Sequence, residues 1–231
     1  MVSSARALGA ANDDEQRLWD AYHHLLMGPD VERLRKLLVR YDFFKMVLDR
    51  PGDIVECGVF KGAGLLTWLK LMHIHAPASA RRVVGFDTFD AFAQPSSSTD
   101  AEAVAAFVQE TAHAGTSPQA LLELAAAAGI DRGRCELVAG DIGTTAATYV
   151  RANPGFRIAL LHMDLDLGDP TFAALQALWP RVIPGGVVVF DEYAAPRWSE
   201  SDGVDRFFAG TGVRLRTLPH ARTPTAYAIK E

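Results

Sequence analysis

The chain has 231 residues, of which 49% are hydrophobic and 22% charged, and its formal net charge is -5 at pH 7. A chain of this length and composition can bury a sizeable core, which excludes an intrinsically disordered protein. Its acidic balance argues against a nucleic-acid-binding surface, because that function needs a basic stripe.

The cysteine content and the hydropathy pattern indicate the compartment. Cys57 and Cys135 each lie in or beside an apolar run, which predicts buried thiols rather than a disulfide or a metal site. The first residues lack the apolar centre of a signal peptide, and no run approaches the roughly 18 apolar residues of a membrane span. We therefore expect a soluble, cytoplasmic protein with neither a membrane nor a nucleic-acid partner.

Two helices are predicted before the first strand, after a loose tail over residues 1–12. Apolar residues recur at helical spacing in both, namely Leu18, Trp19, Tyr22, Leu25 and Leu26, then Leu34, Leu37, Leu38, Tyr41 and Phe44. Asp30 is the expected cap of the second helix. We assign residues 1–50 to a tail and helical cap, and residues 51–231 to the main domain. The helices either cover a sheet edge or a subunit interface, or they form part of a substrate mouth.

A glycine-rich turn follows the first predicted strand, residues 53–57. Gly58, Gly62 and Gly64 lie between this strand and a helix, where glycines permit positive φ angles and the close approach of a ligand. Free N–H groups at the helix start can also receive a carboxylate or a phosphate. The Gly-x3-Gly-x-Gly spacing departs from the Gly-x-Gly-x-x-Gly fingerprint of dinucleotide-binding proteins.

Acidic residues lie beside this turn and after the next two strands. Asp87 follows the second strand, where it can bind both ribose hydroxyls of an adenosine ligand. Glu56 precedes the turn and either binds the ammonium of an amino-acid moiety, caps a helix or forms an ion pair. Asp141 follows the third strand and either binds an adenine amino group or caps the next helix. Two Ala-rich helices, at residues 99–114 and 117–128, are either ordinary crossovers or a lid.

Two strongly apolar runs, residues 158–163 and 187–190, are predicted to be buried parallel strands that a helix connects. Acids follow each run, namely Asp164 with Asp166, and Asp191 with Glu192. Ligands bind at the carboxyl ends of the strands in an open α/β sheet. We therefore expect Asp164, Asp191 and Glu192 to converge around a divalent cation, which relieves their repulsion.

The C-terminal pattern decides the fold prediction. After a helix over residues 199–210, strands at residues 213–218 and 225–229 have no helix between them, so they should pair antiparallel. The predicted architecture is Rossmann-like α/β: a mostly parallel, seven-stranded, doubly wound sheet with an antiparallel terminal hairpin. This is the methyltransferase variation of the fold, whereas a dinucleotide dehydrogenase would continue with parallel crossovers and a second domain.

Within residues 41–193 the chain resembles the macrocin O-methyltransferase family of TylF/MycF type. The resemblance rests on PGDIVECGVFKG at residues 51–62, GFDTF at 85–89, MDLDL at 163–167, and Pro184-Gly185-Gly186 leading to Asp191-Glu192-Tyr193. It implies a class I fold and O-methylation of a sugar or a glycosylated natural product, with S-adenosylmethionine and Mg²⁺ as cofactors. It also implies a homodimer or a higher homo-oligomer.

The resemblance implies roles for particular residues. The cofactor-binding residues would be Glu56, Cys57, Gly58, Val59, Lys61, Gly62, Asp87, Thr88, Phe89, Asp141, Ile142 and Asp164. The metal ligands would be Asp164, Asp191 and Glu192. Members of the family commonly have two aspartates where this chain has Asp191-Glu192, so the second ligand here is longer by one methylene. Leu167-Gly168-Asp169 also replaces a Leu-Tyr-Glu-like continuation, which removes an aromatic wall.

The candidates for catalysis and acceptor binding lie near these acids or in the last turn. A cation that chelates two vicinal sugar hydroxyls would orient the acceptor and lower its pKa. Asp164 and His220 are the candidate catalytic residues, although a histidine in a turn is also commonly solvated. His162 lies on a buried strand, which favours internal packing or hydrogen bonding over catalysis. The candidate substrate residues are Tyr193, Arg197 and Trp198.

Three alternative functions stay open. A metal-assisted catechol methyltransferase often has a lysine shortly after its first metal-binding aspartate, where this chain has Leu167. The glycine spacing and the terminal hairpin argue against a dinucleotide oxidoreductase. A non-catalytic domain that keeps the cofactor fold would have no need to retain every candidate metal ligand.

Overall fold

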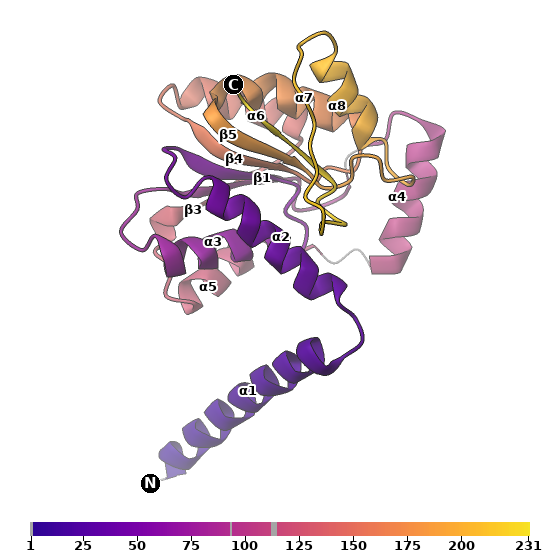
Figure 1. Cartoon of the computed structure of the whole chain (residues 1–231). Coiled ribbons are helices and arrows are strands. Elements are labelled where there is room, and N and C mark those ends of the chain that lie inside the picture. Colours follow the sequence, from indigo (N-terminus) through magenta and orange to yellow (C-terminus); the bar gives the residue numbers. More distant parts are fainter. Residues whose placement is uncertain (1, 93, 112–114) are drawn as a thin grey trace.

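The predicted apolar strands form one sheet in the computed structural model, which describes residues 2–92, 94–111 and 115–231 (Figure 1). The strands are β1 (Asp53–Cys57), β2 (Val83–Asp87), β3 (Cys135–Ala139), β4 (Ile158–Met163), β5 (Val182–Phe190) and β6 (Ala226–Ile229). Their order is β3-β2-β1-β4-β5-β6, and only the β5–β6 pair is antiparallel. The chain changes direction across the sheet between β1 and β4, which is where open α/β sheets bind ligands.

The prediction of seven strands is corrected to six within the described residues. Residues 213–218 form only an isolated antiparallel bridge, between Arg216 and Tyr227 of β6. Gly210 and Gly212 both have positive φ just before this segment, so the chain does not enter it in an extended conformation. The predicted antiparallel ending is confirmed, because β6 pairs antiparallel with β5.

Helices cover both faces of the sheet (Figure 1). α2 (Glu32–Met46), α3 (Ala63–His75) and α5 (Pro118–Ala127) pack on one face, and α6 (Ile142–Ala152), α7 (Gly168–Leu178) and α8 (Glu200–Phe208) pack on the other. α4 (Ser98–Thr111) lies to one side. Two short 3₁₀ turns, η1 (Arg132–Arg134) and η2 (Trp179–Arg181), precede β3 and β5.

Each face of the sheet has its own apolar core. Cys57 and Cys135 are buried free thiols, as predicted.

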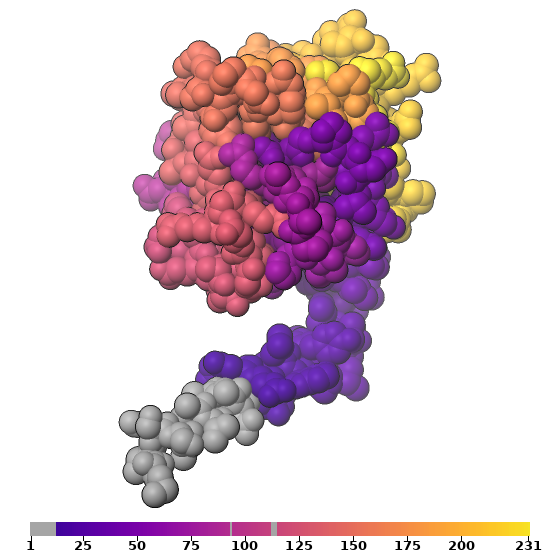
Figure 2. Space-filling view, turned by 90° about the vertical axis from the view of Figure 1, so that its left-hand side faces the viewer, coloured from indigo at the N-terminus to yellow at the C-terminus, as the bar shows by residue number. Residues whose placement is uncertain are grey.

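The two N-terminal helices contact the domain differently. α1 (Val2–Met27) begins inside the predicted loose tail, which is therefore wrong for residues 2–12, and it projects away from the domain (Figures 1 and 2). α2 belongs to the domain, because Val39, Phe43 and Phe44 are buried in the core beside α3. No helix in the described ranges has the length and apolar character that a membrane crossing requires.

Candidate active site

The carboxyl ends of the central strands border a cavity of about 360 Å³. The predicted site residues that line it are Gly58, Asp87, Thr88, Phe89, Asp141, Ile142, Asp164, Asp191, Glu192 and Trp198. Backbone hydrogen bonds place two of the acids directly. Asp164 donates its N–H to the Cys57 carbonyl (2.8 Å), and Asp191 donates to the Met163 carbonyl (2.9 Å). The parallel ladders thus continue one residue beyond β4 and β5, and they carry both acids to the same edge.

The glycine turn holds Asp87 in place. Asp87 Oδ2 accepts hydrogen bonds from the N–H groups of Val59 (2.6 Å) and Phe60 (2.8 Å), and Oδ1 accepts one from Phe89 (2.8 Å). The amides of Val59 and Phe60 belong to the turn before α3, which begins at Ala63, so the expectation of free N–H groups at the helix start is not tested by these bonds. Because three amides hold it, Asp87 has a defined orientation at the cavity wall.

Gly58 is required by packing within the protein. Its φ is 90°, and a Cβ at this position would overlap the backbone oxygen of Asp164. The turn after β1 therefore crosses directly over the end of β4. This close crossing, rather than the approach of a ligand, is what excludes a side chain here.

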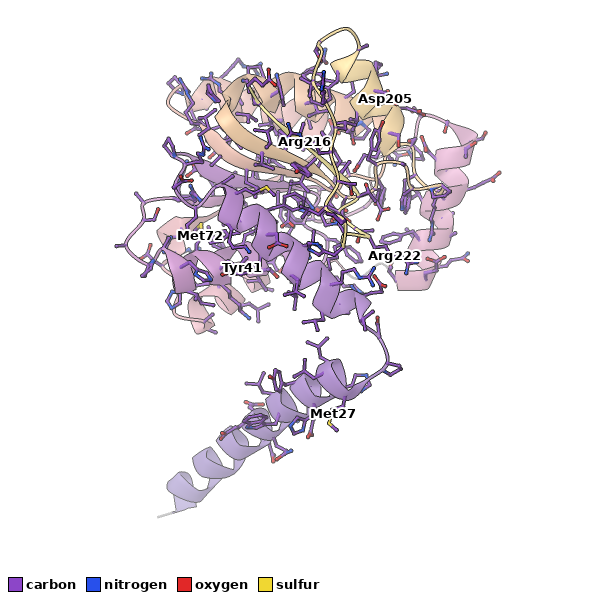
Figure 3. All side chains as sticks on the ribbon, in the orientation of Figure 1. Met27, Tyr41, Met72, Asp205, Arg216 and Arg222 are labelled. Carbon is purple, nitrogen blue, oxygen red and sulfur yellow. The ribbon has the colours of Figure 1, made fainter. Side chains whose placement is uncertain are left out.

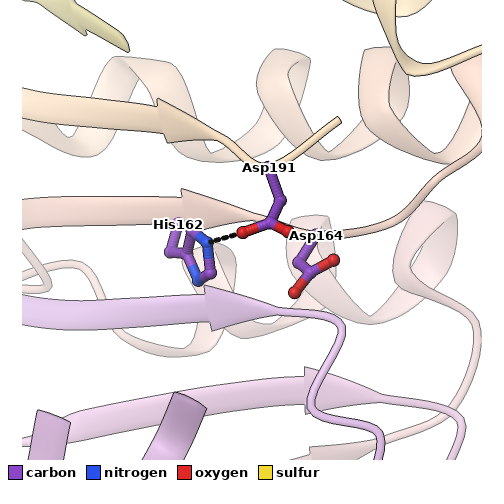
Figure 4. A group of neighbouring side chains, drawn as sticks. All are labelled: His162, Asp164 and Asp191. Atoms are coloured by element: carbon purple, nitrogen blue, oxygen red, sulfur yellow. Dashed lines mark hydrogen bonds and ion pairs between the residues drawn. The ribbon is translucent and has the colours of Figure 1, made fainter. Parts of the chain in front are cut away.

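A buried histidine connects two of the predicted site acids. The side chains of His162, Asp164 and Asp191 each offer a ligand atom within 4.8 Å of the others (Figure 4). His162 Nε2 lies 3.0 Å from Asp191 Oδ1, and Nδ1 lies 3.3 Å from Glu56 Oε1. Burial opposes the charged imidazolium, but the hydrogen bonds with Asp191 and Glu56 outweigh it and raise the pKa of His162 to about 9. Because both of its nitrogens are engaged, His162 orients Asp191 instead of serving as a base.

The carboxylates at this edge repel one another. Burial and the charge of Asp191 raise the pKa of Asp164 to about 6, and burial with Asp191 and Asp164 raises the pKa of Glu192 to about 7. Burial and its acidic neighbours also hold the pKa of Asp166 well above the usual range. This excess of negative charge and the oxygen donors fit a hard divalent cation. Glu192 lines the cavity, but it is outside the three-residue group whose ligand atoms lie within 4.8 Å.

The structure adds two basic residues that the sequence pattern did not reveal. Arg33 and Lys36 of α2 line the cavity, so this helix contributes to its wall as well as to the core. Lys36 Nζ lies 2.8 Å from Asp191 Oδ2. Burial alone would raise the pKa of Asp191, but the His162 hydrogen bond and the Lys36 charge hold it well below the usual range. The available signal was the spacing of Arg33, Lys36 and Arg40 along one side of the helix.

Other predicted cofactor residues lie behind the cavity wall. Glu56 is 1% exposed, and its Oε2 is buried without a hydrogen-bond partner among the residues that the structure describes. Cys57 and Val59 are buried in the two core clusters, and Gly62 precedes α3. Lys61 Nζ donates to the Thr111 carbonyl (3.3 Å) at the end of α4. These residues shape the turn, and the cavity lining does not include them.

The residues predicted for the substrate side divide into two groups. Trp198 lines the cavity and stacks on Phe92, and Phe107 of α4 packs against both rings. Arg197 instead forms an ion pair with Glu110 of α4 (2.8 Å) and lies over the Phe107 and Trp198 rings. The Tyr193 hydroxyl donates to Asp205 (2.9 Å). Sequence reasoning missed Phe92 and Phe107, whose aromatic character alone does not distinguish a cavity wall from a core.

His220 is not brought to this site. It is half-exposed, and its Nε2 lies 3.0 Å from Asp42 Oδ2 on α2. The cavity lining does not include it. Asp164 is therefore the candidate base that the geometry retains.

Glu200 supports the loop that carries the acids. It is fully buried at the start of α8, and its Oε1 accepts a hydrogen bond from the Glu192 N–H (3.0 Å). Burial holds its pKa well above the usual value of 4.5, and Asp164 and Asp191 act in the same direction. Burial therefore favours the neutral form of Glu200 more than that of an exposed glutamate.

We predict that Glu200→Gln is tolerated, whereas Glu200→Ala loses about 1–3 kcal/mol through the lost hydrogen bond and the cavity left behind. The pKa of Glu200 is higher in the folded protein than in the unfolded chain. The free energy of unfolding of the wild type therefore falls as pH rises above the pKa of the unfolded chain. The glutamine amide does not titrate. Between pH 5 and pH 8 the wild type should therefore lose stability relative to Glu200→Gln. Urea unfolding at both pH values measures this, and a pH-independent difference would contradict a raised pKa of Glu200.

Similarity to known proteins agrees with this geometry. A family model described as Macrocin-O-methyltransferase (TylF) matches residues 18–213. The chain is 30% identical over 226 residues to a Streptomyces olivaceus protein, 8-demethyl-8-(2,3-dimethoxy-alpha-L-rhamnosyl)-tetracenomycin-C 4'-O-methyltransferase. That match covers 89% of this chain and 82% of the relative.

The solved structures that resemble this chain are also methyltransferases. The calicheamicin methyltransferase CalS11 superposes with a TM-score of 0.71 at 30% identity, covering 90% of this chain and 83% of its own. Its apo structure, described as a TDP-rhamnose 3'-o-methyltransferase, gives a TM-score of 0.68 at 32% identity and covers 90% and 84% of the two chains. The O-methyltransferase NovP shares the fold, with a TM-score of 0.71 at 22% identity and coverage of 85% and 79%.

Proposed function

The chain belongs to the macrocin O-methyltransferase (TylF) family, and from this premise we propose that it methylates a hydroxyl of a sugar or glycosylated natural product. S-adenosylmethionine would be the donor, and Mg²⁺ or another divalent cation would be the second cofactor. Buried free thiols such as Cys57 suit a reducing cytoplasm as its location. The observation that carries the proposal is the arrangement of Asp87, Asp164 and Asp191 around one cavity at the switch point of the sheet.

The residues present fit both cofactors. Asp87 lines the cavity after β2, where an acid can accept hydrogen bonds from ribose hydroxyls. Asp164 and Asp191 would supply oxygen ligands for a cation. When bound, the two cofactors would supply an electrophilic methyl group and charge stabilisation of the developing alkoxide.

The chain's own residues then perform the proton transfer. Asp164 is the candidate base: its carboxylate lines the cavity and would take the proton from the acceptor hydroxyl. The hydroxyl oxygen would then accept the methyl group of the donor, whose sulfur keeps the electron pair of the broken bond. Trp198, Phe92 and Phe107 form an aromatic wall that excludes water from this step.

Calorimetric titration with S-adenosylmethionine and with NAD tests the donor. A methyl-transfer assay on nucleotide sugars, glycosides and a catechol, with Mg²⁺ or with EDTA, then tests the acceptor and the metal. We expect binding of S-adenosylmethionine only, and Mg²⁺-dependent methylation of a sugar hydroxyl. Binding of NAD alone would overturn the proposal. A preference for catechol would redirect it to the runner-up function, and unchanged turnover in EDTA would remove the metal.

The partner that we propose is a second copy of the chain. An apolar stripe runs along α1 and the exposed side of α2, and its members are Leu18, Trp19, Tyr22, Leu26, Met27, Val31, Leu34, Leu37 and Leu38. Each is between 37% and 84% exposed, and Met27 stands clear of the domain (Figure 3). These nine side chains expose apolar surface to water, and a symmetric interface between two copies of the chain would bury it.

We predict that Tyr22→Asp combined with Leu26→Asp converts the oligomer to a monomer, because both charges would have to be buried in the interface. His24→Asp is the control for position, since it adds one negative charge on the opposite side of α1. Sedimentation velocity measures the masses. A monomeric wild type, or a double variant that keeps the wild-type mass, would contradict the proposed interface.

A further inference from the structure

Lys36 places an ammonium group inside the acidic cluster. Its Nζ lies 2.8 Å from Asp191 Oδ2, while His162 occupies the other oxygen of that carboxylate at 3.0 Å. The Asp191 side chain is only 1% exposed, so both interactions are shielded from water. A cation on Asp191 Oδ2 would have to share this oxygen with Lys36 or displace it.

The cations around the cluster differ in their freedom to move. His162 is held on both nitrogens, and Arg40 is 6% exposed within α2. Lys36 has a flexible four-carbon stem, its side chain is 24% exposed, and it lines the cavity. It is therefore the group that can leave Asp191 without unfolding its surroundings.

Lys36 also acts on Asp164. Lys36, Asp164 and Asp191 line the same cavity, so the ammonium that pairs with Asp191 also faces the second predicted metal ligand. A divalent cation held by the same two carboxylates would be repelled by a charge at that position.

We propose that Lys36 is an internal counter-ion that competes with the divalent cation for Asp191 and thereby sets the affinity of the site. This inference rests on the metal-binding part of the proposed function. Lys36 acts here through Asp191, so it is a positioning residue. Its position on α2 also means that a helix outside the sheet determines how tightly the metal is held.

Titration of the full-length protein with Mn²⁺, followed by electron paramagnetic resonance without donor or acceptor, tests this proposal. We expect Lys36→Met to bind Mn²⁺ at least about tenfold more tightly than wild type, because the competing charge is gone. Lys36→Gln should shift in the same direction, since its side chain is polar but carries no charge. Arg33→Met is the matched control: it removes another cation that lines the cavity from the same helix, and it should leave the affinity unchanged.

Binding by Lys36→Met alone, with none by wild type, would support the proposal strongly. Equal or weaker binding by both Lys36 variants, or no binding by any protein, would overturn it. Thermal unfolding of each variant identifies a misfolded protein. If one of the two Lys36 variants is misfolded, the Mn²⁺ affinity of the other decides the outcome. Methyl transfer by wild type, with and without EDTA, is measured separately. If wild type is active and the Mn²⁺ affinity of the Lys36 variants is unchanged, the counter-ion role of Lys36 is refuted while the proposed function stands.

Discussion

Asp164→Asn should lower kcat at least about a thousandfold. The substitution keeps the size of the side chain but removes both the proton acceptor and one anionic ligand of the proposed cation. It also relieves the repulsion that raises the pKa of Asp164 and Glu192, so the fold should be as stable as wild type or more so. Single-turnover methyl transfer measures the loss, and calorimetry shows whether S-adenosylmethionine still binds within a few fold of wild type.

Asp166→Asn is the matched control for this prediction. Asp166 lines the same cavity and has a φ of 62°, a conformation that asparagine adopts as readily as aspartate. It should retain most of the activity, because the geometry does not assign it the proton. If Asp164→Asn kept more than a tenth of wild-type activity, or if the two variants were equally impaired, Asp164 would not be the base.

Asp87→Ala is the second substitution with a large expected effect, and it acts on the donor site. It leaves the N–H groups of Val59, Phe60 and Phe89 without their carboxylate acceptor. The glycine turn then loses the hydrogen bonds that shape it, and a ribose loses its proposed partner. Because hydrogen bonds to a charged group contribute about 1.5–3 kcal/mol each, we expect S-adenosylmethionine affinity to fall at least about a hundredfold.

Asp90→Ala provides the comparison for Asp87→Ala. Asp90 also lines the cavity, but its side chain is exposed at the rim. Calorimetry should give an affinity for the donor within a few fold of wild type. An Asp87→Ala protein that binds the donor normally would show that the acid after β2 only supports the turn.

The positions of the acids could be predicted from the sequence because strand ends are local features. An apolar run that stops at an acid marks both the strand and its carboxyl end, and parallel pairing then carries Asp87, Asp164 and Asp191 to one edge. Sequence pattern also placed the antiparallel ending at β6. The strand predicted at residues 213–218 is reduced to an isolated bridge, because Gly210 and Gly212 redirect the chain just before it.

Contacts between distant segments could not be read from local patterns. Lys36 meets Asp191 across 155 positions of sequence, and nothing near either residue indicates the pair. Arg197 follows the acids closely enough to suggest a substrate contact, but it pairs with Glu110 of α4. Gly58 was interpreted as space for a ligand, whereas the space is taken by the Asp164 backbone. In each case the packing of separate elements decides the role.

The central claim is that carboxylates at the ends of β4 and β5 bind a divalent cation beside the methyl donor. A crystal structure with Mg²⁺ and S-adenosylhomocysteine tests it most directly. We expect the ion to be bound by Asp164 and Asp191, with the sulfur of the nucleoside facing it across the cavity. An ion bound elsewhere, or a nucleoside bound away from Asp87 and these acids, would contradict the account.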